Sequence, residues 1–204
     1  MLFEDSYRTI KTQGYGEYKE RGSRFIAYTF HVHDEKQCKE IIQQIKKEHP
    51  QAAHHCYAYV LGIAGELKRF NDDREPANTA GRPILRAITA QQLTRTLVVV
   101  VRYFGGKLLG IHGLIEAYEG AAITALQNSE TEEVIIQEQL ELTASYEHEN
   151  DLFRLIKHYN LQVLSHHHGD TVTIRVAVRK SDADEFLKAV KLNYHLSVKF
   201  LTED

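Results

Sequence analysis

Residues 98–114 read VVVVRYFGGKLLGIHGL. The run of valines predicts a strand at residues 97–103 that is buried on both faces, because such strands are continuously apolar and rich in β-branched residues. The glycines of residues 105–113 predict a turn-rich connection, and residues 114–127 follow as a helix. A loop that opens a helix leaves backbone N–H groups unpaired, and with the helix dipole these groups favour an anion such as phosphate.

A second segment of the same kind lies upstream. Residues 71–81 predict a loop, and Pro83 at a first helical position predicts a helix over residues 84–93. From Pro76 to Ile115 the chain has no acidic residue, whereas its basic residues there are Arg82, Arg86, Arg95, Arg102 and Lys107. The two loops therefore define a local basic region.

The composition limits the class of protein. The chain has 204 residues, a net charge of -3 and 43% hydrophobic residues, which excludes a disordered chain and a general basic coat for nucleic acid. No apolar run approaches the ~20 residues of a membrane span. Residues 1–5 lack the basic start and apolar stretch of a secretory signal, and Cys38 and Cys56 fit no metal or redox spacing. We therefore expect a cytoplasmic protein with reduced thiols.

The first half of the chain carries further predicted elements. Alternating apolar and polar residues predict a strand at residues 24–32. Asp34 is expected to cap a helix that runs to about Glu48. Residues 56–62 predict another strand, and residues 65–70 are its expected hairpin partner. The polar, acidic residues after the helix at 114–127 separate this part from the rest of the chain.

That separation, at residues 128–133, predicts one domain at residues 1–132 and a second at residues 133–204. The second domain has the order βαββαβ, with strands at 134–145, 161–165, 171–178 and 196–201, and helices at 150–159 and 182–192. This order is that of the ferredoxin-like fold, a four-stranded antiparallel sheet with both helices on one face.

Two local features of the second domain carry their own predictions. Ser181 is expected to cap the helix at residues 182–192. Residues 166–170 read HHHGD and are expected to form the hairpin turn between the second and third strands. Clustered imidazoles can bind a metal adventitiously, and the other interpretation is an exposed turn without function.

The basic region of the first domain predicts a phosphate-binding surface. Side-chain contacts to phosphates are expected from Arg82, Arg86, Arg102 and Lys107, stacking on bases from Tyr103 with Phe104, and backbone N–H groups or close approach from Thr79, Gly81, Gly105, Gly106 and Gly110. The glycine loop is not a nucleotide-hydrolysing P-loop, because the spacing differs and Leu108 replaces Ser or Thr. The alternatives are that Arg102 pairs with an acid such as Glu75, that Phe104 is a core residue, and that the glycines serve only close packing.

Two groups of residues are candidates for binding a metal ion or for supplying a nucleophile. Asp72, Asp73 and Glu75 offer carboxylate oxygens to Mg²⁺, but such a run is more often a solvated loop or a helix cap, and we assign no metal site. On a strand, His54 and Cys56 share one face, which is too few ligands for zinc. A nucleophilic cysteine would also need a third, orienting group.

Several motifs resemble the Impact family, and in particular its bacterial YigZ-like branch. They are SRFIA at 23–27, HP at 49–50, HCYAY at 55–59, TAGRPIL at 79–85 and, most specifically, VVRYFGG at 100–106 followed by LG at 109–110, GL at 113–114 and AY at 117–118. The resemblance covers nearly the whole chain. It implies the α+β class, with an N-terminal domain like the second domain of a small-ribosomal-subunit protein and a C-terminal ferredoxin-like domain. Family members usually have glycine where this chain has Arg74, Asn78 and His112, so these loops are expected to be bulkier.

The resemblance also implies a role in translation, because the eukaryotic relatives are translation regulators that compete for the co-activator of a starvation-sensing kinase. We expect a non-enzymatic nucleic-acid- or ribosome-associated protein that regulates translation under stress and needs no cofactor. Its expected partners are RNA, the ribosome or a translation-associated protein. The alternatives are a metal-dependent enzyme acting on a small phosphorylated compound, with Asp72, Asp73 and Glu75 as ligands, and an assembly factor without a ligand site.

Overall fold

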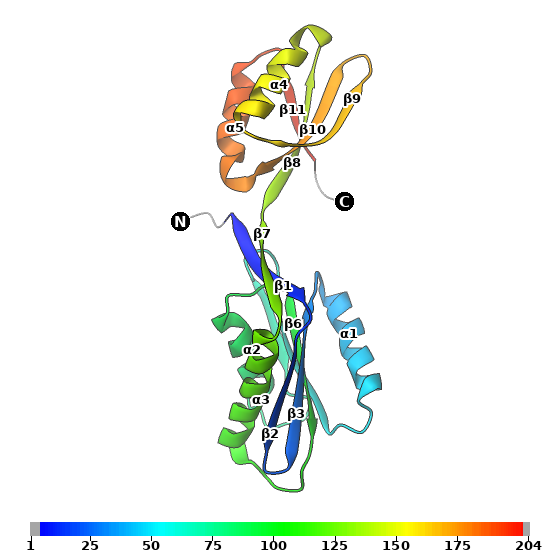
Figure 1. Ribbon diagram of the computed structural model, residues 1–204, viewed down its shortest axis with the longest axis vertical. Helices are drawn as coiled ribbons and strands as arrows, with labels where there is room; N and C mark the ends of the chain where they lie inside the picture. The colour runs from blue at the N-terminus through cyan, green and yellow to red at the C-terminus, as the bar shows by residue number, and fades with distance from the viewer. Residues whose placement is uncertain (1–4, 202–204) are drawn as a thin grey trace. The chain divides into compact units, whose positions relative to one another are not determined.

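The computed structural model describes residues 5–201, which form two compact units (Figure 1). One unit comprises residues 7–134, and the other comprises residues 135–201 together with Asp5 and Ser6. The predicted domain boundary between residues 132 and 133 falls within strand β7 (Glu130–Ile135). The first four residues, on which the expected lack of a secretory signal depends, lie outside the described residues.

A five-stranded antiparallel sheet with helices on both faces forms most of the first unit (Figure 1). Its strands are, in spatial order, β2 (Tyr15–Glu20), β3 (Ser23–His31), β6 (Thr96–Tyr103), β4 (His54–Leu61) and β5 (Leu67–Asn71). Helix α1 (Glu35–Glu48) covers one face, and helices α2 (Gly81–Ala90) and α3 (Gly110–Gln127) cover the other. Asp34 caps α1 as predicted, because its side chain accepts the N–H of Gln37 at 2.7 Å.

Strand β6 lies at the centre of this sheet and has the two buried faces that its valines predict. Val98 and Val100 pack in the core with α2 and α3, whereas Val99 and Val101 pack in the core with α1. Successive side chains of a strand point to opposite faces, so one apolar run supplies both cores.

Helices α2 and α3 begin earlier than the sequence predicts, at Gly81 and Gly110 instead of residues 84 and 114. For α2 the reason is that the Asp72 side chain accepts the N–H groups of residues 80 and 81. For α3 the reason is Gly110, whose φ of +72° turns the loop into the helix. Buried residues such as Tyr118 anchor α3 despite its glycines.

Strand β1 (Ser6–Thr12) and strand β2 were not predicted, and residues 128–133 are not a simple linker. Strands β1 and β7 pair as a two-stranded sheet. Thr12 Oγ1 donates to Glu130 Oε2 at 3.0 Å, and Arg8 Nη2 donates to Thr131 Oγ1 at 3.2 Å. Glu130 and Thr131 of β7 therefore have polar partners on β1, which their sequence alone does not indicate.

The second unit has the predicted ferredoxin-like order βαββαβ. Its elements are β8 (Gln137–Ala144), α4 (Glu149–His158) after a short 3₁₀ turn at Tyr146–His148, β9 (Gln162–His168), β10 (Val172–Arg179), α5 (Lys180–Leu192) and β11 (Ser197–Leu201). The strands form an antiparallel sheet in the order β11-β8-β10-β9. One core joins the inward side chains of the sheet to α4 and α5, including Leu152 and Phe186. The α+β class is thus confirmed in both units.

Two local predictions for this unit are wrong. The histidines at 166–168 lie in β9 and not in a turn, because β9 pairs with β10 up to His168. The turn is formed by the next residues, and the N–H of Gly169 donates to the carbonyl of Thr171 at 3.0 Å. Ser181 lies inside α5, and its N–H and hydroxyl both donate to the Asp5 carboxylate at 2.8 Å, so it does not cap the helix.

Candidate nucleic-acid interface

A carboxylate of the chain itself occupies the N-terminus of α2. Asp72 Oδ1 accepts the N–H groups of Ala80 and Gly81 at 3.0 and 2.8 Å, and Oδ2 accepts that of Asn78 at 2.9 Å. The N–H and hydroxyl of Thr79 both donate to a carbonyl within the loop. Thr79 and Gly81 therefore have no free backbone donor for a phosphate, because Asp72 stands where an external anion would bind.

This loop keeps a glycine-like backbone at two of the positions where relatives usually have glycine. Arg74 and Asn78 have φ angles of +72° and +64°, in the left-handed region. His112 is exposed in the first turn of α3. The substitutions thus keep the path of the loop around Asp72 and add side chains to its surface.

Arg102 lies in the core and not on the basic surface. It is 5% exposed, and its Nη1 lies 2.5 Å from Oε1 of Glu75, which is 9% exposed. Tyr118 donates its hydroxyl to the same oxygen at 2.8 Å, and burial raises the pKa of Tyr118. Arg102 is therefore neutralised and unavailable to phosphates, which matches the alternative that the sequence left open. Phe104 is 52% exposed, so it is not a core residue.

The remaining carboxylates of the loop also have structural partners. Asp73 Oδ2 accepts the N–H of His55 at 2.7 Å, and the Asp73 carbonyl lies 2.8 Å from His54 Nδ1. Among the described residues, Asp72, Asp73 and Glu75 do not bring three ligand atoms together. The three carboxylates bind three different parts of the fold, so they stabilise the loop and do not form a magnesium site.

Cys56 is fully buried, and its Sγ lies 3.1 Å from the carbonyl of Asp72, to which the thiol donates. Burial raises the pKa of this thiol, which disfavours the thiolate. A cysteine nucleophile needs the opposite shift. Cys56 is therefore a core residue.

The Tyr103 side chain lies on the face of the sheet that α1 covers, opposite to α2 and α3. Its hydroxyl lies 2.8 Å from Nδ1 of His49, whose Nε2 contacts the hydroxyl of Tyr28 at 2.9 Å. Tyr103 packs against the core that contains α1. The side chain is thus separated by the sheet from α2 and α3 and does not join the predicted surface.

A hollow of about 650 Å³ brings together Thr79, Arg82 and Arg86 of the predicted surface, whereas Lys107 and the glycines at 105, 106 and 110 do not line it. It lies over α2 and the start of α3, and its lining includes Lys68, Thr79, Arg82, Arg86, Ile111 and Ile115, with no carboxylate. Lys68 and Arg82 are exposed and form no hydrogen bond or ion pair through their side chains with the described residues. Arg86 is different, because its guanidinium donates to both carboxylate oxygens of Glu119, and this pairing raises its pKa.

In the glycine loop before α3, Gly105 packs closely against the backbone and the residues after it are exposed. A Cβ on Gly105 would lie 1.9 Å from the backbone carbon of Gly22, so Gly105 permits a close backbone crossing. Gly106 faces open space with a φ of +82°. Beyond it, Lys107 is exposed, Leu108 is 84% exposed and Ile111 is 61% exposed. No side chain caps α3, and its first turn has no acidic residue. Of the two helix starts predicted to bind an anion, only the start of α3 is left without an acidic or capping side chain.

Sequence reasoning missed the contribution of Lys68 and of the apolar residues Leu108 and Ile111. Lys68 lies on β5, 14 residues before Arg82, and the two meet only because β5 pairs with β4 beside α2. The basic character of residues 82–107 was the one available signal, and it indicated the region without indicating which charges are free.

Both units match known families. Residues 21–126 match the Impact N-terminal domain, and residues 142–191 match a domain of unknown function, DUF1949. The fold and this pair of matches define a two-domain protein of the Impact class. The chain belongs to the IMPACT family. Among the described residues, no helix is long and apolar enough to cross a membrane.

Relatives from two bacteria resemble most of the chain. The IMPACT family member YvyE of Bacillus subtilis is 33% identical over 89% of this chain and 83% of its own. The IMPACT family member YigZ of Escherichia coli is 32% identical over 80% of this chain and 81% of its own. A crystal structure of a hypothetical protein has a TM-score of 0.68 with 28% identity over 99% of both chains. The similarity therefore includes both units.

Proposed function

We propose that this protein is a non-enzymatic RNA-binding protein that associates with the ribosome and regulates translation under stress. The observation that carries the proposal is the hollow over α2 and the start of α3. It holds two uncompensated cations, Lys68 and Arg82, and no carboxylate lines it. Membership of the IMPACT family supports the role in translation, since the eukaryotic members that the sequence resembles act there.

The chemistry of the hollow suits a phosphate backbone better than a small ligand. It is broad and open, and its cations are long side chains on an exposed surface. Such charges bind successive phosphates with modest, salt-dependent affinity. The exposed Phe104, Leu108 and Ile111 add apolar surface for unstacked bases. In this proposal Lys107 contributes a further phosphate contact from the glycine loop.

The other candidate, a metal-dependent enzyme acting on a small phosphorylated compound, has less support. It requires Asp72, Asp73 and Glu75 as metal ligands. Asp72 accepts the N–H groups at the start of α2, and Glu75 accepts from Arg102 and Tyr118. Removing any of these carboxylates from its partners would leave buried polar groups unsatisfied.

The experiment is a fluorescence-anisotropy titration of a labelled single-stranded RNA over a series of salt concentrations. Each phosphate contact that is lost lowers the magnitude of the log–log salt slope by about 0.7 for single strands. The double variant Lys68→Ala/Arg82→Ala is therefore expected to lower it by about 1.4 and to weaken binding at low salt. Lys107→Ala is expected to lower it by about half that amount.

The matched control is Lys39→Ala/Lys47→Ala, which removes two exposed cations from α1 on the other face of the sheet. It changes the net charge equally, so a nonspecific effect of charge would lower both slopes alike. Equal slopes for the two double variants, or no RNA binding by the parent protein, would contradict the proposal.

A further inference from the structure

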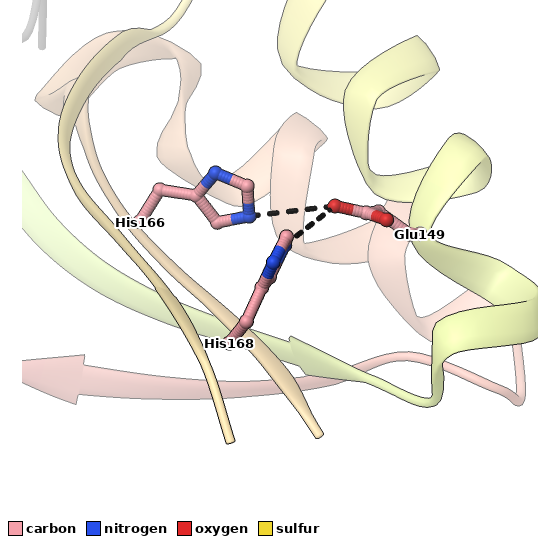
Figure 2. A group of neighbouring side chains, drawn as sticks. All are labelled: Glu149, His166 and His168. Carbon is pink, nitrogen blue, oxygen red and sulfur yellow. Dashed lines mark hydrogen bonds and ion pairs between the residues drawn. The ribbon is translucent and has the colours of Figure 1, made fainter. Parts of the chain in front are cut away.

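Two imidazoles and one carboxylate converge in the second unit, outside the proposed interface. Figure 2 shows His166 and His168 reaching from β9 toward Glu149 at the start of α4. Glu149 Oε1 lies 3.4 Å from His166 Nε2 and 2.9 Å from His168 Nε2, and the ligand atoms of all three lie within 4.8 Å of one another. We propose that Glu149, His166 and His168 bind a divalent transition-metal ion, Zn²⁺, and leave one coordination position open.

A β-bulge places both imidazoles on the same side of the sheet as Glu149. The pairing of β9 with β10 shifts by one residue, which leaves Leu164 without a partner of its own. As a result His166 and His168 lie opposite Ile174 and Val172, whose side chains are buried under the helices. Without this shift in register His166 would lie opposite Thr173, and both imidazoles would lie on the sheet face away from α4.

The distances already approach those of a metal site. Zinc bonds of about 2.0–2.2 Å in tetrahedral geometry place neighbouring ligand atoms about 3.3 Å apart. The two separations from Glu149 Oε1, 2.9 and 3.4 Å, lie on either side of this value. Two histidines and one glutamate are also a ligand set of zinc sites that keep a fourth position for water. The three ligand atoms are therefore already near the spacing that a bound ion requires.

Aromatic side chains pack against both imidazoles, and the negative charge of Glu149 has no lysine or arginine beside it among the described residues. Phe153 packs edge to face against His166, and Tyr146 does so against His168. In the part of the chain that the structure describes, Glu149 has no lysine or arginine partner, and the two imidazoles are the groups in contact with its carboxylate. A bound cation would supply the positive charge that neutral imidazoles lack.

The site is open to solvent, and this sets the expected strength of binding. The side chains are 33%, 50% and 28% exposed for His166, His168 and Glu149. Within the described residues neither histidine has a hydrogen-bond partner on Nδ1. Loss of such hydrogen bonds to the metal-binding side chains weakens metal affinity by about 10–100-fold, so we expect weaker binding than in a closed structural site.

The test is isothermal titration calorimetry of the full-length, tag-free, metal-free protein with ZnCl₂. The expected result is one ion per chain. His166→Ala, His168→Ala and Glu149→Ala are each expected to weaken binding by about tenfold or more. The matched control is His167→Ala, because His167 alternates to the opposite face of β9 and its loss should change the affinity by less than about twofold.

A second measurement uses the unmodified protein and does not depend on how the variants fold. In NMR spectra, Zn²⁺ is expected to shift the ring signals of His166 and His168 and to leave those of His167 unchanged. No heat of binding to the parent protein would overturn the proposal. So would an equal loss with His167→Ala, or ring shifts spread over all three histidines, because these would indicate adventitious binding to a histidine-rich strand.

Discussion

Arg102 and Glu75 form a buried ion pair in the first unit, with 2.5 Å between Arg102 Nη1 and Glu75 Oε1. Tyr118 donates to the same carboxylate oxygen from α3. The pair joins β6, the loop before α2 and helix α3, three elements that are distant in the sequence. It therefore explains why a cation from the basic region is withdrawn from the surface.

Glu75→Ala is expected to lower the free energy of unfolding by about 3–5 kcal/mol, because it leaves the buried Arg102 guanidinium without a counter-charge. Urea denaturation followed by circular dichroism measures this change. The double variant Glu75→Leu/Arg102→Met is expected to recover most of the loss, since no uncompensated charge remains. A cost below about 1 kcal/mol for Glu75→Ala would mean that Arg102 reaches solvent in the folded protein.

Asp72→Ala is expected to cost about 0.5–2 kcal/mol, the range for removing a side chain that accepts the N–H groups at the start of a helix. It also exposes the N–H groups of Ala80 and Gly81 to external anions. Sulfate is therefore expected to raise the melting temperature of the variant more than that of the parent, relative to chloride at equal ionic strength. Equal responses of the two proteins to sulfate would show that Asp72 does not occupy an anion position.

Phe104→Ala tests the apolar part of the proposed RNA surface. Stacking of one base on an aromatic ring contributes about 1–3 kcal/mol, so RNA affinity is expected to fall while the salt slope stays the same. Anisotropy titrations at several salt concentrations separate these two effects. Tyr194→Ala is the matched control, because Tyr194 is 85% exposed in the other unit. If both variants bind RNA like the parent, Phe104 does not contact bases.

The pH dependence of stability is expected to involve His55. Burial lowers the pKa of His55 from its ordinary value of 6.5, against the opposing effects of the His49 carbonyl and Asp73. Below that value the unfolded chain binds a proton that the folded protein resists, so stability is lost as the pH falls from about 6.5. His55→Gln is expected to flatten the fall between pH 7 and pH 5 in urea denaturation. The exposed His112→Gln serves as control and should keep the parent's slope.

The sequence predicts those elements whose own residues determine their environment. The valines of β6 require two apolar faces, and the pattern of α1 places Cys38, Ile42 and Ile45 in the core. The βαββαβ order of the second unit follows from the same kind of pattern. Strands β1 and β7 were missed because their charged residues find partners on each other, which no local pattern indicates.

The candidate site could be predicted only as a region. Arg82 and Arg102 look alike in the sequence, yet one is exposed and the other is buried beside Glu75. The difference depends on which face of β6 or α2 carries each residue and on a partner 27 residues away. The histidines of β9 show the same limit, because a one-residue shift in the register of β9 against β10 decides which face of the sheet they lie on.

The hydrogen bonds between Asp5 and Ser181 make the second unit discontinuous in the sequence. During synthesis Asp5 leaves the ribosome early, and its partner follows 176 residues later. These contacts therefore form only after residue 181 has been made, and a fragment that starts at residue 135 lacks the Asp5 carboxylate that binds the start of α5.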